Sequence, residues 1–386
     1  MQEALADRFN RQNRRVRVRV LTQFGESGYQ KVRISFAGGA TPDLMSTVWA
    51  ADLASYALRG VLMPLDDYLA RSGRSLTEWT PGVARMLTVE GETYGLAVTT
   101  NTTIIAYNKA IFREVGLDSE NSLRTIDELD EAALRCTTRD ASGGYVRYGF
   151  RPSDLPTWAY VFGGQWVDPA SGAITASHEG NLAALRWFQS YSKRYDLRKM
   201  QAFQTTFGNV KSPSAPFFVG KIALWQTGEW AQRYVRRYAP KLDWGWFSLP
   251  KPSGGRSDVS AVDGSVFVIP AACRNKDAAW EFLNWLSSPV PVKEFCTEAH
   301  NLPPLIKVGE DAVFQNDPLY KFCVGLSQGQ NAFGPPPIPI WSTYKQEIQR
   351  TEEKVMLSGA DPEQALNSLQ KAMEKELRDA REELQR

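Results

Sequence analysis

Apolar runs of strand length recur along the chain, and each is bounded by turn-forming residues. One opens at residues 42–45, two cover residues 95–98 and 104–107, and another lies within residues 218–230. Runs this short between glycine, proline and polar residues are typical of buried β-strands. Trp49 follows the first run and precedes a helical pattern, which places it in a strand-to-helix loop. In open α/β sheets such loops lie where ligands bind.

Helical patterns follow several of these runs. Asp52 opens an amphipathic stretch, Asn108 is placed to cap a helix that stops at Gly116, and residues 276–286 repeat apolar positions at helical spacing. Asp361 and the proline after it form the start signal of a last, highly charged helix. The alternation of strands and helices predicts an α/β protein.

The amino terminus follows a different order. Residues 1–13 predict a first helix, and Val16, Val18 and Val20 then alternate with arginines, which predicts a strand over residues 16–21 with one polar face. The helix therefore precedes the first predicted strand.

Composition narrows the class of protein. The chain has 386 residues, with 43% hydrophobic and 23% charged, and its net charge is +2. This length allows two domains, and the balanced charge gives no electrostatic footprint for nucleic acid or an anionic membrane surface. Twelve tryptophans require a large core or an apolar ligand face to cover them. No apolar stretch approaches the roughly 18 residues of a membrane span.

Cysteine and histidine give little sign of metal chemistry. The four cysteines, Cys136, Cys273, Cys296 and Cys323, lack metal-type spacing, and the only two histidines are far apart in sequence. We interpret the cysteines as small buried residues, with one disulfide as the alternative if the protein is exported. No metal or cofactor is expected.

Four blocks of sequence together carry a family resemblance. Residues 38–65, 91–116, 218–230 and 276–286, in this order, resemble the extracellular solute-binding proteins of ABC importers, in the sugar-binding branch that includes maltose-binding protein. The resemblance runs over nearly the whole chain. It implies a type II periplasmic-binding-protein fold with two lobes, each a mainly parallel sheet flanked by helices, and a ligand cleft between the lobes.

The resemblance also implies a domain assignment. Residues 1–106 and 265–312 would form the first lobe, and residues 107–264 and 313–386 the second, with hinge crossings near residues 99–103, at Asp263–Gly264 and near Val313. Family members carry a strand before the first helix, and that strand is missing here. We therefore expect that the chain begins late, without its export signal and first strand.

A sugar presents an apolar face of C–H groups and a rim of hydroxyls, so its site needs aromatic platforms and convergent polar groups. By resemblance, Trp49 and Asp52 match the first-lobe loop, Trp158 and Trp230 match second-lobe segments, and Asn101 stands where maltose-binding protein has an acidic residue. The full set of predicted ligand contacts is Gln23, Phe24, Trp49, Asp52, Asn101, Trp158, Trp225, Trp230, Asp263, Gly264, Trp341 and Tyr344.

Each of these candidates has a structural alternative. Tryptophans commonly pack beneath helices, and Asp52 could cap its own helix. Two other functions stay open. A phosphorylated polyol such as glycerol phosphate would need cations, for which Lys345 and Arg151 are the candidates. A glycoside hydrolase would need a carboxylate pair, which Asp52, Asp154 and Glu229 could supply, although no local pattern marks a catalytic pair.

The predicted function is therefore that of a binding protein without catalysis. It would capture a sugar or oligosaccharide by closure of two lobes and deliver it to ABC permease subunits in the membrane. The resemblance implies a periplasmic or extracellular, cell-surface location, a monomer, and no nucleic-acid partner.

Overall fold

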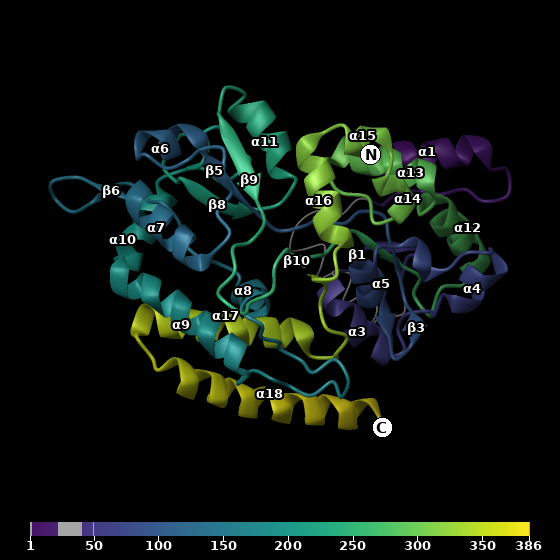
Figure 1. The fold of residues 1–386 in the computed structure, drawn as a ribbon. Helices are drawn as coiled ribbons and strands as arrows, with labels where there is room; N and C mark the ends of the chain where they lie inside the picture. Colours follow the sequence, from purple (N-terminus) through teal and green to yellow (C-terminus); the bar gives the residue numbers. More distant parts are fainter. Residues whose placement is uncertain (1, 22–40, 49, 386) are drawn as a thin grey trace. The chain divides into compact units, whose positions relative to one another are not determined.

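The computed structural model describes residues 2–21, 41–48 and 50–385, and the chain divides into two compact units (Figure 1). Unit 1 comprises residues 1–102, 261–342 and 379–386, and unit 2 comprises residues 103–260 and 343–378.

Unit 1 is mixed α/β and contains more helix than strand. Its helices are α1 (Gln2–Gln12), α3 (Ala50–Leu58), α4 (Asp66–Arg71), the 3₁₀ turn η1 (Leu76–Glu78), α5 (Pro81–Leu87), α12 (Lys276–Leu286), α13 (Pro289–Ala299), α14 (Ile306–Gly309), α15 (Ala312–Gln315) and α16 (Pro318–Gln328). Its strands are β1 (Met45–Val48), β2 (Thr88–Val89), β3 (Glu92–Thr93), β4 (Leu96–Ala97), β11 (Val266–Val268) and β12 (Ala332–Phe333), while β10 (Ser260–Ala261) falls at the boundary of the two units.

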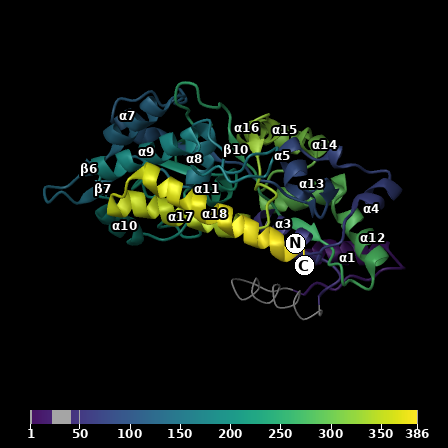
Figure 2. The same cartoon turned by 90° about the horizontal axis from the view of Figure 1, so that it is seen from below.

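Unit 2 is also mixed α/β. Its helices are α6 (Lys109–Glu114), α7 (Ile126–Cys136), α8 (Leu155–Val161), α9 (Glu179–Arg194), α10 (Leu197–Thr205) and α11 (Ala231–Tyr238), followed by most of α17 (Trp341–Ser358) and α18 (Pro362–Leu384). Its strands are β5 (Ile104–Asn108), β6 (Thr138–Arg139), β7 (Tyr145–Arg147), β8 (Leu224–Thr227) and β9 (Trp244–Phe247). Figure 2 shows α18 running alongside α17.

The two main sheets differ in strand direction from the expected mainly parallel sheets. In unit 1 the order is β1-β11-β4, in unit 2 it is β8-β5-β9, and both ladders are antiparallel. The parallel contacts of unit 2 in the described residues are isolated bridges, such as the one from Tyr148 to Ile222. In unit 2, β5 is the central strand, and both of its neighbours run antiparallel to it.

The division into units also differs from the assignment made from sequence. Residues 313–342 belong to unit 1, whereas the sequence analysis gave them to the second lobe. The reason is packing, because α16 and β12 both lie against α5.

The core of unit 1 is organised by Trp79. Its side chain is buried, and the indole N–H donates to the carbonyl oxygen of Ala97 over 2.9 Å. The guanidinium of Arg74 lies over the indole ring, 4.8 Å from its centre. A hydrogen-bonded indole inside a core combines a large apolar surface with a satisfied polar group.

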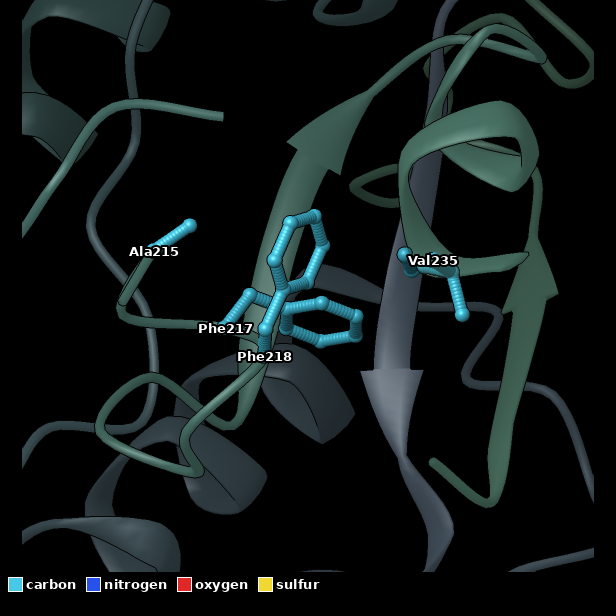
Figure 3. Close-up of a cluster of buried hydrophobic side chains, with 5 residues drawn as sticks. Ala215, Phe217, Phe218 and Val235 are labelled. Atoms are coloured by element: carbon cyan, nitrogen blue, oxygen red, sulfur yellow. The ribbon is translucent and has the colours of Figure 1, made fainter. Parts of the chain in front are cut away.

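The core of unit 2 is a cluster of aromatic rings. Trp158 and Trp187 lie with ring centres 4.6 Å apart, and Phe150 and Tyr191 join them. Asp130 accepts hydrogen bonds from the Trp187 indole N–H at 3.0 Å and from the Tyr191 hydroxyl at 2.8 Å. A smaller apolar cluster around Phe217, Phe218 and Val235 lies beside the strands (Figure 3).

Several local predictions are confirmed. Asn108 caps α6 by accepting the Ile111 N–H at 3.1 Å, and Asp361 accepts the Gln364 N–H at the start of α18. The four cysteines, all within the described part of the chain, are buried and form no disulfide.

The strand predicted over residues 16–21 is wrong, because none of these residues lies in a β-strand. The side-chain amide of Asn10 hydrogen-bonds to both backbone polar groups of Val18. Its oxygen accepts the Val18 N–H at 2.7 Å, and its nitrogen donates to the Val18 carbonyl oxygen at 2.8 Å. A side chain that occupies both groups removes them from a strand ladder.

Asn181 joins the first turn of α9 to the loop that precedes this helix. It is fully buried, and its Nδ2 group lies 2.7 Å from the carbonyl oxygen of Gln165 and 2.9 Å from that of Thr175. We expect Asn181→Ala to lower the free energy of unfolding by about 2–3 kcal/mol, because buried carbonyls lose their donor. Denaturant unfolding measures this change.

The matched control is Gln364→Ala, which removes an exposed side-chain amide from α18. A loss of more than about 0.5 kcal/mol is not expected there. Equal losses in the two variants would contradict the role given to Asn181.

Candidate functional site

The candidate site is a pocket of about 840 Å³ that lies entirely within unit 2. Its volume falls in the ordinary range for small-molecule sites. The residues that line it come from the β7–α8 connection, α10, the loop after α10, β8 and α17. They are Tyr148, Arg151, Ser153, Asp154, Pro156, Gln201, Gln204, Thr205, Phe207, Gly208, Asn209, Val210, Ala215, Pro216, Phe217, Phe218, Ile222, Leu224, Trp225, Gln226, Lys345, Gln349, Glu352 and Glu353.

Aromatic rings form one part of this lining. Trp225 is half-buried on β8, and its ring centre lies 5.4 Å from that of Phe217 and 6.3 Å from that of Phe218. Packing against these buried rings fixes the orientation of Trp225 while part of its surface stays exposed. Such a ring can cover the apolar face of a ligand.

Gln226 is the polar residue next to Trp225 on β8. Its Oε1 accepts the indole N–H of Trp158 at 2.8 Å and the hydroxyl of Ser153 at 3.4 Å. These bonds fix the amide plane, so the Nε2 group has a defined direction as a donor.

Asp154 lies at the N-cap position of α8 in the left-handed region, with φ of 62°. Its Oδ2 accepts the hydroxyl of Thr157 at 2.5 Å. Aspartate tolerates this backbone conformation better than most residues, and such conformations cluster at functional sites.

One polar face of α17 completes the lining. Lys345, Gln349, Glu352 and Glu353 are spaced at helical intervals, so they share one side of the helix. Glu352 is half-buried, and its carboxylate accepts the N–H of Leu155 at 3.4 Å.

Burial raises the pKa of Glu352 to about 7, and the negative charge of Asp154 acts in the same direction. The Leu155 N–H and the charge of Arg151 lower this pKa but only partly compensate. The Nε of Arg151 is buried and has no hydrogen-bond partner among the described residues. Burial also raises the pKa of Tyr148 well above its ordinary value.

Among the ligand contacts predicted from sequence, the pocket contains Trp225. It also contains Arg151 and Lys345, the cations proposed for a phosphorylated ligand, and Asp154, one of the carboxylates considered for hydrolysis.

Three other predicted aromatics of this region lie elsewhere. Trp158 is fully buried in the aromatic core, so its ring offers no surface to a ligand in this structure. Tyr344 is fully buried, and its hydroxyl donates to the carbonyl oxygen of Trp166 at 3.1 Å. Trp230 does not line the pocket, although it is half-buried and its ring centre lies 5.5 Å from that of Trp225.

The other predicted contacts among the described residues belong to unit 1, where their ligand role stays a prediction. Asp52 is half-buried in the first turn of α3, which begins two residues earlier and so is not capped by it. Trp341 is buried at the first position of α17. Gln23, Phe24 and Trp49 lie outside the described residues.

Asn101, Asp263 and Gly264 form one group in unit 1. The Asn101 side chain accepts the N–H of Asp263 at 3.0 Å, and the Asn101 N–H donates to the Asp263 carbonyl oxygen at 3.1 Å. A Cβ atom added at Gly264 would lie 2.0 Å from the carbonyl oxygen of Thr99. The close approach of the two backbone segments therefore requires glycine at position 264. The Asn101 oxygen therefore already has a backbone partner.

Other pocket residues were not among the contacts predicted from sequence; they include Gln226, Glu352, Gln349 and Phe217. The α17 residues could have been found by continuing from Lys345 at helical spacing, which reaches Gln349 after one turn and Glu352 after two. Gln226 carries no such signal, because its place depends on a bond to Trp158.

The raised pKa of Glu352 generates a stability prediction. Between about pH 4.5 and about pH 7 the folded protein keeps a proton that the unfolded chain has lost, so this group contributes less stability as pH rises through that window. Glu352→Gln should therefore raise the free energy of unfolding by about 1–3 kcal/mol at about pH 8, and by much less at about pH 4. Chemical denaturation at the two pH values measures the difference.

Glu376→Gln, on an exposed position of α18, is the matched control and should show no such pH dependence. If Glu352→Gln changed stability equally at both pH values, the account of this carboxylate would be wrong.

Comparison with known proteins gives the context of this pocket. Residues 1–293 match the model of the bacterial extracellular solute-binding proteins. The maltotriose-binding protein of Pyrococcus abyssi (strain GE5 / Orsay) is 22% identical over 340 residues, which is 86% of this chain and 69% of that protein.

Solved structures agree with this match. The structure of CpMnBP1 with mannotriose bound is 26% identical in sequence to this chain. The superposition covers 96% of this chain and 95% of the CpMnBP1 chain, with a TM-score of 0.84. The sugar-binding protein MalE of Xanthomonas citri is 22% identical. Its superposition covers 100% of this chain and 96% of the MalE chain, with a TM-score of 0.81. The MalE likeness confirms the predicted type II fold, and the family match makes this chain a member of the bacterial extracellular solute-binding proteins.

Proposed function

We propose that this protein binds a sugar or oligosaccharide through the unit 2 pocket and delivers it to the membrane permease of an ABC importer. The observation that carries the proposal is the composition of the pocket, in which the exposed part of Trp225 lies beside Gln226, Asp154 and the polar face of α17. A sugar needs this combination of an aromatic platform and oriented hydrogen-bonding groups. The mannotriose complex of CpMnBP1 and the maltotriose-binding relative support the ligand class.

Binding without turnover is part of the proposal. The matched family and the similar structures are binding proteins. Of the carboxylates considered for hydrolysis, Glu229 is fully buried, and Asp52 belongs to unit 1 while Asp154 belongs to unit 2. The local structure of none of the three favours a catalytic pair.

A phosphorylated polyol is the second candidate ligand, because Arg151 and Lys345 both line the pocket. Three carboxylates, Asp154, Glu352 and Glu353, lie in the same lining. Since a phosphate would meet these negative charges as well as the two cations, the charge balance favours a sugar over this alternative.

The proposed location is the cell exterior or the periplasm, as the family description implies. In the part of the chain that the structure describes, no helix combines the length and apolar character needed to cross a bilayer. Association with permease subunits follows from the transport context of relatives such as the maltooligosaccharide-binding lipoprotein of Streptococcus pneumoniae.

A ligand screen tests the proposal. Mannobiose, mannotriose, maltotriose, mannitol and glycerol 3-phosphate should be compared by thermal shift and then by calorimetry. A saccharide present at about 100 times its Kd should stabilise the protein by about 2.7 kcal/mol. Binding of glycerol 3-phosphate alone would replace the proposal with the second candidate, and consumption of a saccharide would contradict binding without turnover.

Trp225 allows a residue-level prediction. We expect Trp225→Ala to weaken binding of the best saccharide by about 2 kcal/mol or more, because it removes the exposed aromatic surface of the pocket. Calorimetry measures the change in Kd.

Trp244→Ala is the matched control, since Trp244 packs on the same apolar cluster as Trp225 but does not line the pocket. It should disturb packing to a comparable extent and leave the affinity within about threefold. If both variants lost affinity equally, Trp225 would contribute through packing and not through contact with the sugar.

A further inference from the structure

The charged side chains of the pocket come from two segments that face each other within unit 2. Arg151 and Asp154 precede α8, and Lys345, Glu352 and Glu353 belong to α17. The lining residues from α10, from the loop after it and from β8 are uncharged. With all groups ionised, two positive and three negative charges therefore surround the pocket.

None of these three carboxylates is held in an ion pair within the described part of the chain. Among the described residues, no ion pair joins Asp154, Glu352 or Glu353 to an arginine or lysine. Asp154 instead accepts the Thr157 hydroxyl, and Glu353 accepts the amide of Gln349 at 3.1 Å. Each carboxylate thus has acceptor capacity left for a ligand donor.

Glu352 is the carboxylate most sensitive to a ligand. It is half-buried, its one hydrogen bond in the described structure is the 3.4 Å contact with the Leu155 N–H, and Asp154 directly precedes that N–H in sequence. A second negative charge brought into this part of the pocket would act through poorly screened surroundings. A neutral hydroxyl could instead donate to the carboxylate.

We propose that Glu352 is a specificity-determining residue of the pocket, and that with Asp154 it makes the pocket select uncharged saccharides and polyols over uronic or phosphorylated ones. This inference rests on the proposed function and refines its ligand class. Arg151 and Lys345 do not reverse the selection, because their charges only partly balance three carboxylates.

The raised pKa of Glu352 adds a condition to this selection. With its pKa raised to about 7, the carboxyl is about half ionised near pH 7, carries most of its negative charge at about pH 8 and loses that charge on acidification. Discrimination against anionic ligands should therefore be strongest in mildly alkaline solution and should weaken on acidification.

Matched ligand pairs test the inference on the full chain. Mannotriose and trimannuronate differ in the carboxylates at C6, and mannitol and mannitol 1-phosphate differ in one phosphate. At about pH 8, calorimetry should show at least about tenfold tighter binding of the uncharged member of a pair, equivalent to about 1.4 kcal/mol.

The ratio of the affinity for the uncharged member of a pair to the affinity for the anionic member measures the discrimination. Glu352→Gln should lower this ratio by at least about threefold, which corresponds to about 0.65 kcal/mol. Its affinity for the uncharged member should change less than its affinity for the anionic one. At about pH 5.5 the ratio of the affinity for mannotriose to that for trimannuronate should become similar in the unmodified protein and in Glu352→Gln. The reason is that the uronate stays ionised at this pH while Glu352 does not. Glu376→Gln is the control and should keep the original ratio.

Asp154→Asn provides a second variant if Glu352→Gln does not fold, since asparagine also tolerates the left-handed conformation. An unchanged ratio in the folded variant, or tighter binding of the anionic members by the unmodified protein, would overturn the inference alone. Failure of all four probes to bind would instead count against the proposed function itself, and the inference would fall with it.

Discussion

The hydrogen bond from the buried indole of Trp158 to Gln226 connects the interior of unit 2 to its pocket. Trp158 belongs to α8 and is fully buried in the aromatic core, and its indole N–H donates to the Gln226 side chain 2.8 Å away. A buried donor without an acceptor is costly, so this pair fixes α8 relative to β8. Both segments then present pocket residues: Asp154 at the start of α8, and Trp225 and Gln226 on β8.

The structure distinguishes tryptophans that pack in the core from a tryptophan that lines the pocket, a distinction that composition cannot make. Trp158 and Trp187 stabilise unit 2 from within, with ring centres 4.6 Å apart, while Trp225 lies at the edge of an apolar cluster and stays partly exposed. The exposed part of Trp225 is useful for binding because buried rings behind it prevent the side chain from turning away. Rigid aromatic surfaces lose little conformational entropy when a ligand binds.

Charge is the second constraint on the pocket. The net charge of the chain, +2, gives no indication of the local excess of carboxylates, because distant residues compensate for it. Within the pocket, partial burial makes each charge more effective than on an open surface. A nearly neutral protein can therefore discriminate strongly between neutral and anionic ligands.

The sequence by itself determined the α/β class, the family resemblance and local features such as the Asn108 cap and helix α12, because these depend on residues close together in the chain. It failed for residues 16–21, where the Asn10 side chain occupies backbone groups of Val18 that a strand would need. Tertiary structure decided which tryptophan faces the pocket and that Glu352 lies opposite Asp154, because the pocket assembles segments as far apart in sequence as Tyr148 and Glu353. Hydrophobic periodicity tells that a residue is buried, but only packing determines what it is buried against.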